Sequence, residues 1–226
     1  MPEKLRVEIA PDQQVTALIY PAANHNQIDV TVLLGHGAGA DQNSDFMMQF
    51  ATGLAARGIN AVTFNFLYTE QRRRVPDSNN ALEACFRAMI EAVRHKKIGR
   101  GTLVIGGKSL GGRIASQIAA AGANVAGLVF LGYPLHPPGR ADQLRATHLP
   151  DIKVPMLFLQ GSRDAFGTPT ELQPIIKGLK GPADLYVVEG GDHSFKVLKR
   201  AGVTQGDTNT AVLDRIEVWL RRTFAS

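Results

Sequence analysis

Hydrophobic residues follow two patterns along this chain, and the two patterns alternate. Short uninterrupted runs, such as residues 29–34 and 127–131, are typical of buried β-strands. Longer segments repeat hydrophobic residues every three or four positions, which is typical of an α-helix with one buried face. The clearest of these segments covers residues 79–95. Its apolar positions are Leu82, Cys85, Phe86, Met89, Ile90 and Val93.

The two patterns together predict the order of the elements. We expect strands at residues 5–9, 15–20, 29–34, 61–66, 102–106, 127–131, 154–160 and 185–188. We expect helices at residues 46–57, 79–95, 113–121, 170–179 and 209–222. The first two strands are close enough to form an antiparallel hairpin. Because the later strands alternate with helices, the chain is predicted to be an α/β protein with a mostly parallel central sheet and helices on both faces.

The chain has the length of one such domain. A single α/β domain of 226 residues can bury a sizeable core, so we expect residues 1–226 to form one domain. The pattern leaves no room for a separate cap domain. Residues 134–150 are the largest irregular segment close to the predicted site, and they either shape the rim of a pocket or merely connect two strands.

The most informative motif lies between the strand at residues 102–106 and the helix at residues 113–121. It reads Gly107-Lys108-Ser109-Leu110-Gly111 and fits G-x-S-x-G, the nucleophile elbow. In this sharp strand-to-helix turn, a strained backbone projects the serine hydroxyl. The glycines on either side let strand and helix approach each other without a Cβ clash. We therefore predict that Ser109 is a nucleophile.

The partners of such a serine follow it in the chain as an acid and then a histidine. Asp164 lies just beyond the strand at residues 154–160, and His193 lies beyond the strand at residues 185–188. Parallel strands place their carboxyl ends at one edge of a sheet, where open α/β sheets bind ligands. Asp192 is a rival for the acid, but it is the immediate neighbour of His193 and is poorly placed to reach the imidazole. We therefore predict Asp164 as the acid and His193 as the base.

A glycine-rich loop supplies a candidate oxyanion hole. Acyl transfer needs two backbone N–H groups directed at the developing oxyanion. Leu110, the residue after the nucleophile, should supply one of them. The other should come from the loop Gly35-His36-Gly37-Ala38-Gly39-Ala40, with Ala38 as the first choice and Gly39 as the second. This loop lacks the patterns of nucleotide-binding loops, and His36 is expected to brace it through backbone hydrogen bonds.

Together these motifs resemble a known family. The HGAGA loop, the GGKSLGG elbow, the GSRD turn and the GGDHSF turn look like those of a small α/β-hydrolase of the dienelactone-hydrolase-like kind. The resemblance extends over residues 29–193, including a Gly-Tyr-Pro-Leu-His-Pro-Pro-Gly stretch at residues 132–139 that a group of compact serine hydrolases shares. True dienelactone hydrolases use a cysteine nucleophile, whereas this elbow carries Ser109. The resemblance implies a cap-less serine hydrolase.

Composition and charge restrict the partners. The net charge of +5 is small for this length, and no basic run alternates with aromatic residues, so nucleic-acid binding is not expected. The single cysteine, Cys85, cannot form an internal disulfide, which favours a reducing compartment. The N-terminus has no signal-peptide pattern and no segment is long enough to span a bilayer. We expect a cytoplasmic protein with no membrane association, no cofactor and no metal. The sequence does not indicate an oligomeric state.

Two functional hypotheses remain. The first is a serine hydrolase that cleaves a small carboxylic ester or related acyl compound through an acyl-enzyme; thioesterase, lactonase and peptidase activities are all compatible with it. The second is a non-catalytic interaction protein on a hydrolase scaffold. Without a cap domain, short substrates should be preferred. Arg72, Arg73 and Arg74 follow a strand at the same sheet edge, so they either bind a substrate carboxylate or form a solvated loop.

Overall fold

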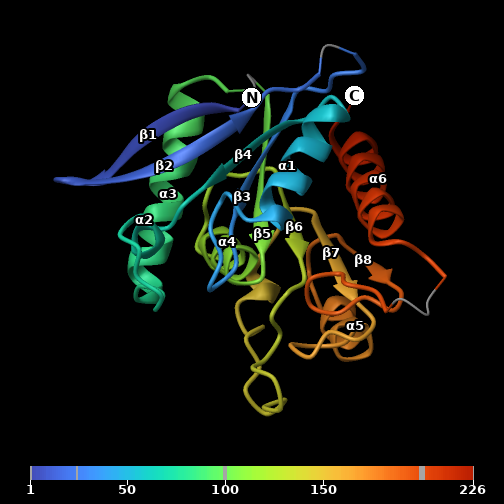
Figure 1. The fold of residues 1–226 in the computed structure, drawn as a ribbon. Helices are drawn as coiled ribbons and strands as arrows, with labels where there is room; N and C mark the ends of the chain where they lie inside the picture. The colour runs from blue at the N-terminus through green and yellow to red at the C-terminus, as the bar shows by residue number, and fades with distance from the viewer. Residues whose placement is uncertain (1, 24, 99–100, 199–201, 226) are drawn as a thin grey trace.

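A sheet of eight strands forms the centre of the structure (Figure 1). The computed structural model describes residues 2–23, 25–98, 101–198 and 202–225. The strand order across the sheet is β1-β2-β4-β3-β5-β6-β7-β8. The strands are β1 (Glu3–Ala10), β2 (Gln13–Tyr20), β3 (Val30–Gly35), β4 (Asn60–Phe64), β5 (Thr102–Lys108), β6 (Gly127–Leu131), β7 (Met156–Gly161) and β8 (Ala183–Val188). β2 is antiparallel to both β1 and β4, whereas the strands β3 to β8 run parallel to one another. The predicted parallel sheet with an N-terminal hairpin is confirmed.

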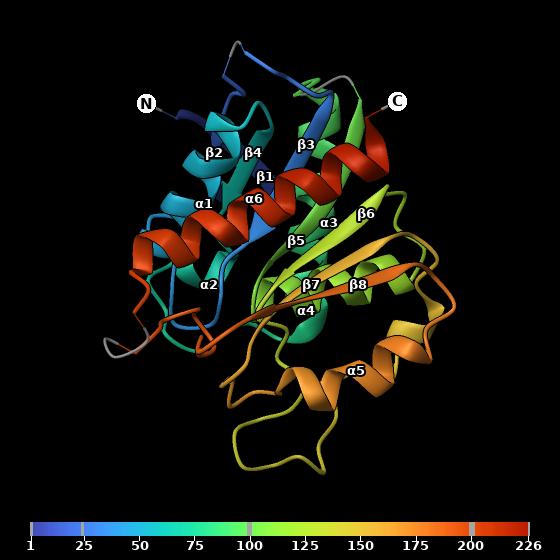
Figure 2. The same ribbon diagram turned by 90° about the vertical axis from the view of Figure 1, so that its right-hand side faces the viewer.

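Helices cover both faces of this sheet (Figure 2). One layer consists of α1 (Asp45–Ala56) and α6 (Gln205–Phe224). The opposite layer consists of α3 (Asn79–His95), α4 (Leu110–Ala120) and α5 (Pro169–Lys177). Two short elements, α2 (Leu67–Glu70) and the 3₁₀ helix η1 (Leu149–Asp151), lie in connecting segments.

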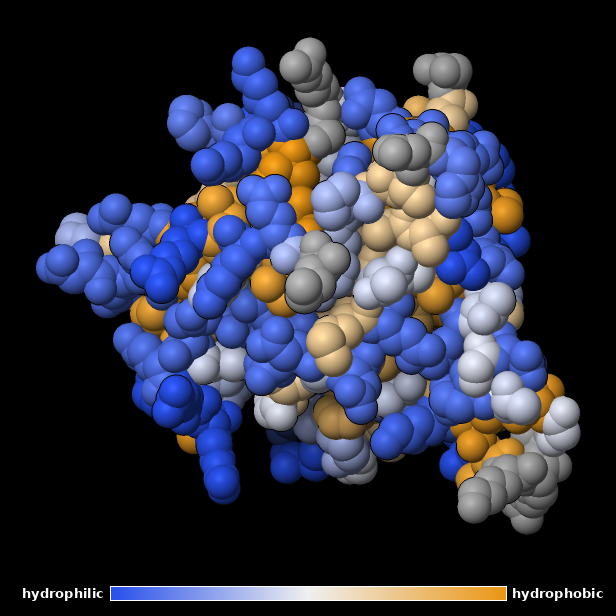
Figure 3. All heavy atoms as spheres, turned by 45° about the horizontal axis from the view of Figure 1, so that its top comes forward, coloured by the Kyte–Doolittle hydropathy of each residue, from blue (hydrophilic) through white to orange (hydrophobic). Residues whose placement is uncertain are grey.

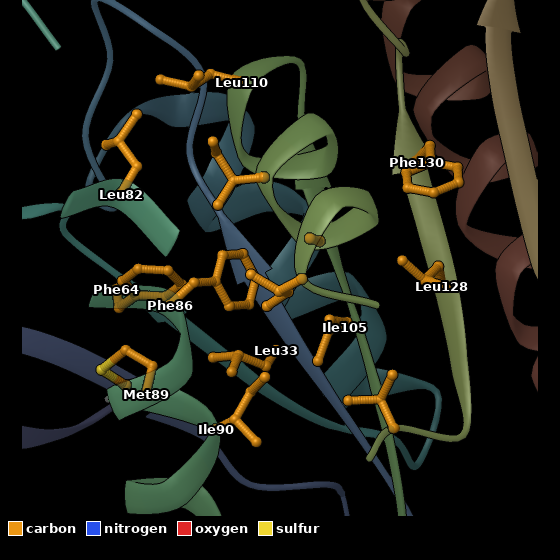
Figure 4. Packing of buried hydrophobic residues seen from close by; sticks show 14 of the residues in the cluster. Leu33, Phe64, Leu82, Phe86, Met89, Ile90, Ile105, Leu110, Leu128 and Phe130 are labelled. Carbon is orange, nitrogen blue, oxygen red and sulfur yellow. The ribbon is translucent and has the colours of Figure 1, made fainter. Parts of the chain in front are cut away.

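Each face of the sheet has its own hydrophobic core. Side chains along a strand point alternately to its two faces. In β5, Leu103 and Ile105 belong to the core beneath α3 and α4, whereas Val104 belongs to the core beneath α1 and α6. Figure 4 shows the first core, where Phe86 of α3 packs edge-on against Phe64 of β4. Burial on both faces explains why the central strands are continuous hydrophobic runs in the sequence.

The structure departs from the predicted elements mainly where helices begin. α4 begins at Leu110, directly after the elbow, rather than at residue 113. α6 begins at Gln205 rather than at residue 209, because Thr204 and Asp207 form a reciprocal capping box. The first turn of α6 is polar and therefore gives no hydrophobic signal. α2 is a single turn, too short to show a helical period, and the hydrophobic pattern does not predict it.

The surface seen in Figure 3 is mostly hydrophilic, with hydrophobic side chains in scattered groups. Within the described ranges, no helix combines the length and the apolar character needed to cross a membrane.

Candidate active site

The three side chains predicted to carry the chemistry follow three strands of the parallel part of the sheet. Ser109 comes directly after β5, Asp164 lies in the turn after β7, and His193 lies in the turn after β8. Because these strands are parallel, the turns meet at the carboxyl-terminal edge of the sheet. The structure therefore brings together the three residues that the sequence singles out.

The turn at Ser109 has the geometry of an elbow. Ser109 adopts φ 50° and ψ −109°, a conformation that a non-glycine residue rarely takes. The neighbouring chain is very close, because a Cβ atom on either Gly107 or Gly111 would lie 2.1 Å from the carbonyl oxygen of Gly35 in β3. Only glycine fits at these two positions. The strain at Ser109 is therefore maintained by tight packing of the turn against β3.

A continuous chain of hydrogen bonds links the three side chains. His193 Nε2 lies 2.8 Å from Ser109 Oγ. On the other side of the ring, His193 Nδ1 lies 2.7 Å from Asp164 Oδ2 and 2.9 Å from Oδ1. A neutral imidazole with its proton on Nδ1 satisfies both contacts, because Nδ1–H donates to the carboxylate and Nε2 accepts from the serine hydroxyl. In this arrangement the histidine is ready to take the serine proton.

Asp164 is held in place by groups that the sequence does not reveal. Its side chain is fully buried. Gln160 Nε2 donates to Asp164 Oδ2 at 2.8 Å, and the backbone N–H of Phe166 donates to Oδ1 at 2.8 Å. Gln160 is itself buried and accepts a hydrogen bond from the backbone N–H of Tyr133. The only sequence signal for Gln160 is a lone polar residue at the end of a hydrophobic run.

Asp192, the rival acid, binds backbone N–H groups of its own turn. Its Oδ1 accepts hydrogen bonds from the backbone N–H groups of Ser194 at 2.7 Å and Lys196 at 2.9 Å. These bonds fold the turn that carries His193. The imidazole makes its carboxylate contacts with Asp164 alone among the described residues.

The environment of His193 favours the neutral imidazole. Burial lowers the pKa of His193 below its usual 6.5, and the hydrogen bond to Asp164 opposes this shift only in part. The ring also stacks on Phe166, with centroids 4.1 Å apart. A neutral histidine is the form that can act as a general base.

Lys108, the residue before Ser109, is a part of the site that sequence reasoning missed. Its side chain is buried, and its ammonium donates a hydrogen bond to the backbone carbonyl of His193 at 2.5 Å. Burial lowers the pKa of Lys108 to about 8, although the carboxylates of Asp164 and Asp192 act in the opposite direction. The charge of Lys108 in turn lowers the pKa of His193.

Two backbone N–H groups are available beside the serine. Among the described residues, the N–H groups of Ala38 and Leu110 donate no hydrogen bond. The loop that carries Ala38 reaches the elbow, because a Cβ atom on Gly37 would lie 3.6 Å from Ser109 Cβ. Ala38 and Leu110 both line the pocket at Ser109, whereas Gly39 lines a neighbouring hollow. This placement favours Ala38 over Gly39.

His36 braces the same loop, as predicted. It is fully buried, with Nδ1 2.9 Å from the carbonyl oxygen of Gly37 and Nε2 accepting from the backbone N–H of Phe66 at 3.2 Å. Burial lowers the pKa of His36, which keeps the ring neutral and able to make both contacts.

Comparison with known proteins identifies the family. A family model described as an alpha/beta hydrolase domain matches residues 28–221, which is most of the chain. The chain belongs to this alpha/beta hydrolase family. The match includes the elbow, both turns with Asp164 and His193, and the loop with Ala38.

Solved structures of other alpha/beta hydrolases have the same fold. A dienelactone hydrolase from Anabaena variabilis is 19% identical, with a TM-score of 0.77 over 99% of this chain and 98% of that one. An alpha-beta serine hydrolase homologue from Coxiella burnetii is 20% identical, with a TM-score of 0.73 over 98% and 97%. An α/β serine hydrolase without lid from Xanthomonas campestris is 20% identical, with a TM-score of 0.73 over 98% and 94%. At such identities the likeness shows the fold alone, and it agrees with the prediction of a hydrolase without a cap.

In this alpha/beta hydrolase, Ser109 opens into a pocket of about 600 Å³. Phe46, Met47, Leu82 and Phe166 supply apolar walls, and Ser109 and His193 lie beside them. The same pocket is lined by Lys108, Arg113 and Arg145, which sequence reasoning does not single out. Within the described ranges, no group of three or more His, Cys, Asp or Glu side chains is arranged to hold a metal ion.

The arginines predicted for substrate binding lie elsewhere. Arg72, Arg73 and Arg74 are exposed and line a separate hollow that adjoins the pocket at Ala40 and Ser44. Arg73 is paired with Asp77 at 2.5 Å. A role for these three arginines in binding substrate stays a prediction.

Proposed function

We propose that this alpha/beta hydrolase is a serine hydrolase that cleaves a small carboxylic ester or related acyl compound through an acyl-enzyme. The observation that carries the proposal is the unbroken hydrogen-bond chain from Ser109 through His193 to Asp164, at a pocket where two backbone N–H groups have no partner among the described residues. A serine hydroxyl is a weak nucleophile unless a base takes its proton, and this chain supplies the base and its orienting acid.

The proposed reaction has two halves. Ser109 Oγ attacks the acyl carbonyl carbon while His193 Nε2 takes the hydroxyl proton, and the N–H groups of Ala38 and Leu110 stabilise the resulting oxyanion. The bond to the leaving group then breaks, and His193 gives its proton to the departing atom. Water next attacks the acyl-enzyme with His193 again as the base, which releases the acid and restores Ser109.

The pocket supports a short substrate. A volume of about 600 Å³ accommodates a compact molecule, and the described residues include no cap that could cover a long acyl chain. Esters, thioesters, lactones and amides all fit the same chemistry, so the proposal names an acyl compound and not one type of leaving group. The cytoplasmic location inferred from the single cysteine is likewise a proposal.

Turnover of a panel of short esters, thioesters and amides tests the proposal. Wild-type protein should hydrolyse at least one class, and Ser109→Ala should lower kcat by up to about 10⁶-fold, since members of such a chain act as a unit. Ser44→Ala is the matched control: this serine also lines the pocket, but its hydroxyl donates to the carbonyl of Asp41. Near-normal turnover by a folded Ser109→Ala protein contradicts the proposal. No turnover of any substrate by wild type favours a non-catalytic interaction protein.

A further inference from the structure

The charges that line the Ser109 pocket are unbalanced. The lining includes three cationic side chains, Lys108, Arg113 and Arg145, and one carboxylate, Asp77. Asp77 is already engaged, because one of its oxygens pairs with Arg73 and the other accepts from the backbone N–H of Tyr68 at 2.9 Å. The carboxylates of Asp164 and Asp192 lie near Lys108, so the uncompensated positive charge of the pocket lies at Arg113 and Arg145.

Arg113 lies one helical turn beyond Ser109. Its backbone N–H donates to the carbonyl of Ser109 at 3.0 Å, so the helix fixes its distance from the serine. The side chain is partly buried, and burial together with the nearby charge of Arg145 lowers the pKa of Arg113. Among the described residues, its guanidinium forms no ion pair or hydrogen bond. The carboxylate of Glu83 raises the pKa of Arg113 but forms no ion pair with it among the described residues. Glu83 Oε1 instead accepts a hydrogen bond from Asn79 Nδ2 at 2.9 Å.

Arg145 reaches the same pocket from the segment between β6 and β7. Its backbone is fixed on both sides, since its N–H donates to the carbonyl of Leu135 and its own carbonyl accepts from Tyr133 Oη, each at 2.8 Å. Tyr133 is buried in the hydrophobic core. No ion pair or hydrogen bond of the Arg145 guanidinium is found within the described ranges. The segment thus presents an unpaired guanidinium from an anchored backbone.

Two like charges held close together in a partly buried pocket are unfavourable unless an anion lies between them. A guanidinium binds a carboxylate through two parallel hydrogen bonds, which makes arginine pairs well suited to that group. Resting on the proposed function, we propose that Arg113 and Arg145 bind a carboxylate of the acyl substrate. The enzyme then acts on esters or related compounds that carry a second, negatively charged group a few bonds from the scissile carbonyl.

Paired esters test this proposal. Monomethyl glutarate carries the carboxylate on the acyl side, and the acetate ester of a hydroxybutyrate carries it on the leaving-group side. Each is compared with the neutral ester in which an isopropyl group replaces the carboxylate. Charged hydrogen bonds of this kind should raise kcat/KM for one anionic ester about 10- to 100-fold above its neutral counterpart. The preferred member shows on which side of the carbonyl the arginines act.

Variants show whether the two arginines cause the preference. Arg113→Gln and Arg145→Gln should each remove most of the preference, because kcat/KM should fall far more for the anionic ester, mainly through KM, than for the neutral ester. Arg140→Gln is the matched control, because Arg140 lies in the same segment but is exposed and pairs with Asp142 at 3.7 Å. High salt should also reduce the preference, since it screens the attraction. Equal kcat/KM for anionic and neutral esters in wild type, or a preference that survives both substitutions, overturns the proposal.

A binding measurement separates this proposal from the proposed function. Ser109→Ala protein is titrated with monomethyl glutarate and the hydroxybutyrate acetate by calorimetry, with and without Arg113→Gln. Saturable binding that the second substitution abolishes supports the carboxylate site whether or not the wild type turns over esters. If neutral esters are turned over but neither anionic ester binds, the serine hydrolase proposal is supported and the carboxylate site is overturned.

Discussion

Asp164 and Asp192 both follow a parallel strand at the same edge of the sheet, and both influence His193. Asp164 is buried, receives hydrogen bonds from Gln160 and from the Phe166 backbone, and contacts the imidazole through both oxygens. Asp192 adjoins the histidine in sequence, yet its Oδ1 is occupied by two N–H groups of its own turn. The position of an acid after a strand thus does not determine its role. The direction in which its carboxylate is held does.

The largest effect that separates these two acids is expected from replacing each by asparagine. In Asp164→Asn the new amide NH₂ faces His193 Nδ1, which favours the tautomer that cannot take the serine proton. We expect kcat to fall by about 10⁴-fold, the size of this change in Ser-His-Asp enzymes. Steady-state kinetics on the best ester of the panel measures it.

Asp192→Asn is the matched control. Asparagine keeps an oxygen that can accept from Ser194 and Lys196, so the turn should survive and kcat should stay close to that of wild type. If Asp192→Asn is the more damaging substitution, the assignment of the two acids must be reversed.

A smaller effect concerns the pH dependence of kcat/KM. It tests how the charges around His193, including both acids and Lys108, set the pKa of the imidazole. Burial lowers the pKa of His193 below 6.5, and the base must be neutral. The acid limb of kcat/KM should therefore have its midpoint below pH 6.5, with activity lost as the pH falls through it. In Lys108→Met, removal of the ammonium should raise the pKa of His193 and move this limb to higher pH.

Lys196→Met serves as the control for this shift, since Lys196 is exposed on the same turn as His193. Its acid limb should coincide with that of wild type. An unchanged or lower midpoint in folded Lys108→Met protein would show that the charge of Lys108 does not reach the imidazole.

Local sequence patterns predict the fold and the core of the candidate site well. Buried strands are continuous hydrophobic runs, and the order elbow, Asp164, His193 places three residues at strand ends that the topology must bring together. Gln160, by contrast, is a lone polar residue at the end of a hydrophobic run, and its role depends on a hydrogen bond to Asp164 across a turn. Lys108 carries no signal beyond its place in the elbow, because its contact with His193 joins β5 to the turn after β8.

The sequence does not predict which arginines line the pocket. Arg72, Arg73 and Arg74 form a conspicuous run, but they are exposed, and one of them is paired with an acid. Arg113 and Arg145 are isolated in the sequence. They line the same pocket because the segment that carries Arg145 lies against α4, where His148 Nε2 contacts Ser116 Oγ at 2.7 Å. No local pattern encodes this contact.

Labelling with a fluorophosphonate probe, followed by peptide mass spectrometry, tests the central claim most directly. The probe reacts with a serine only when a neighbouring base activates it. The account predicts a single adduct on Ser109 in wild-type protein, a strongly reduced rate in Asp164→Asn and an unchanged rate in Asp192→Asn. An absence of labelling, or an adduct on another residue, would contradict the assignment of Ser109 as the nucleophile.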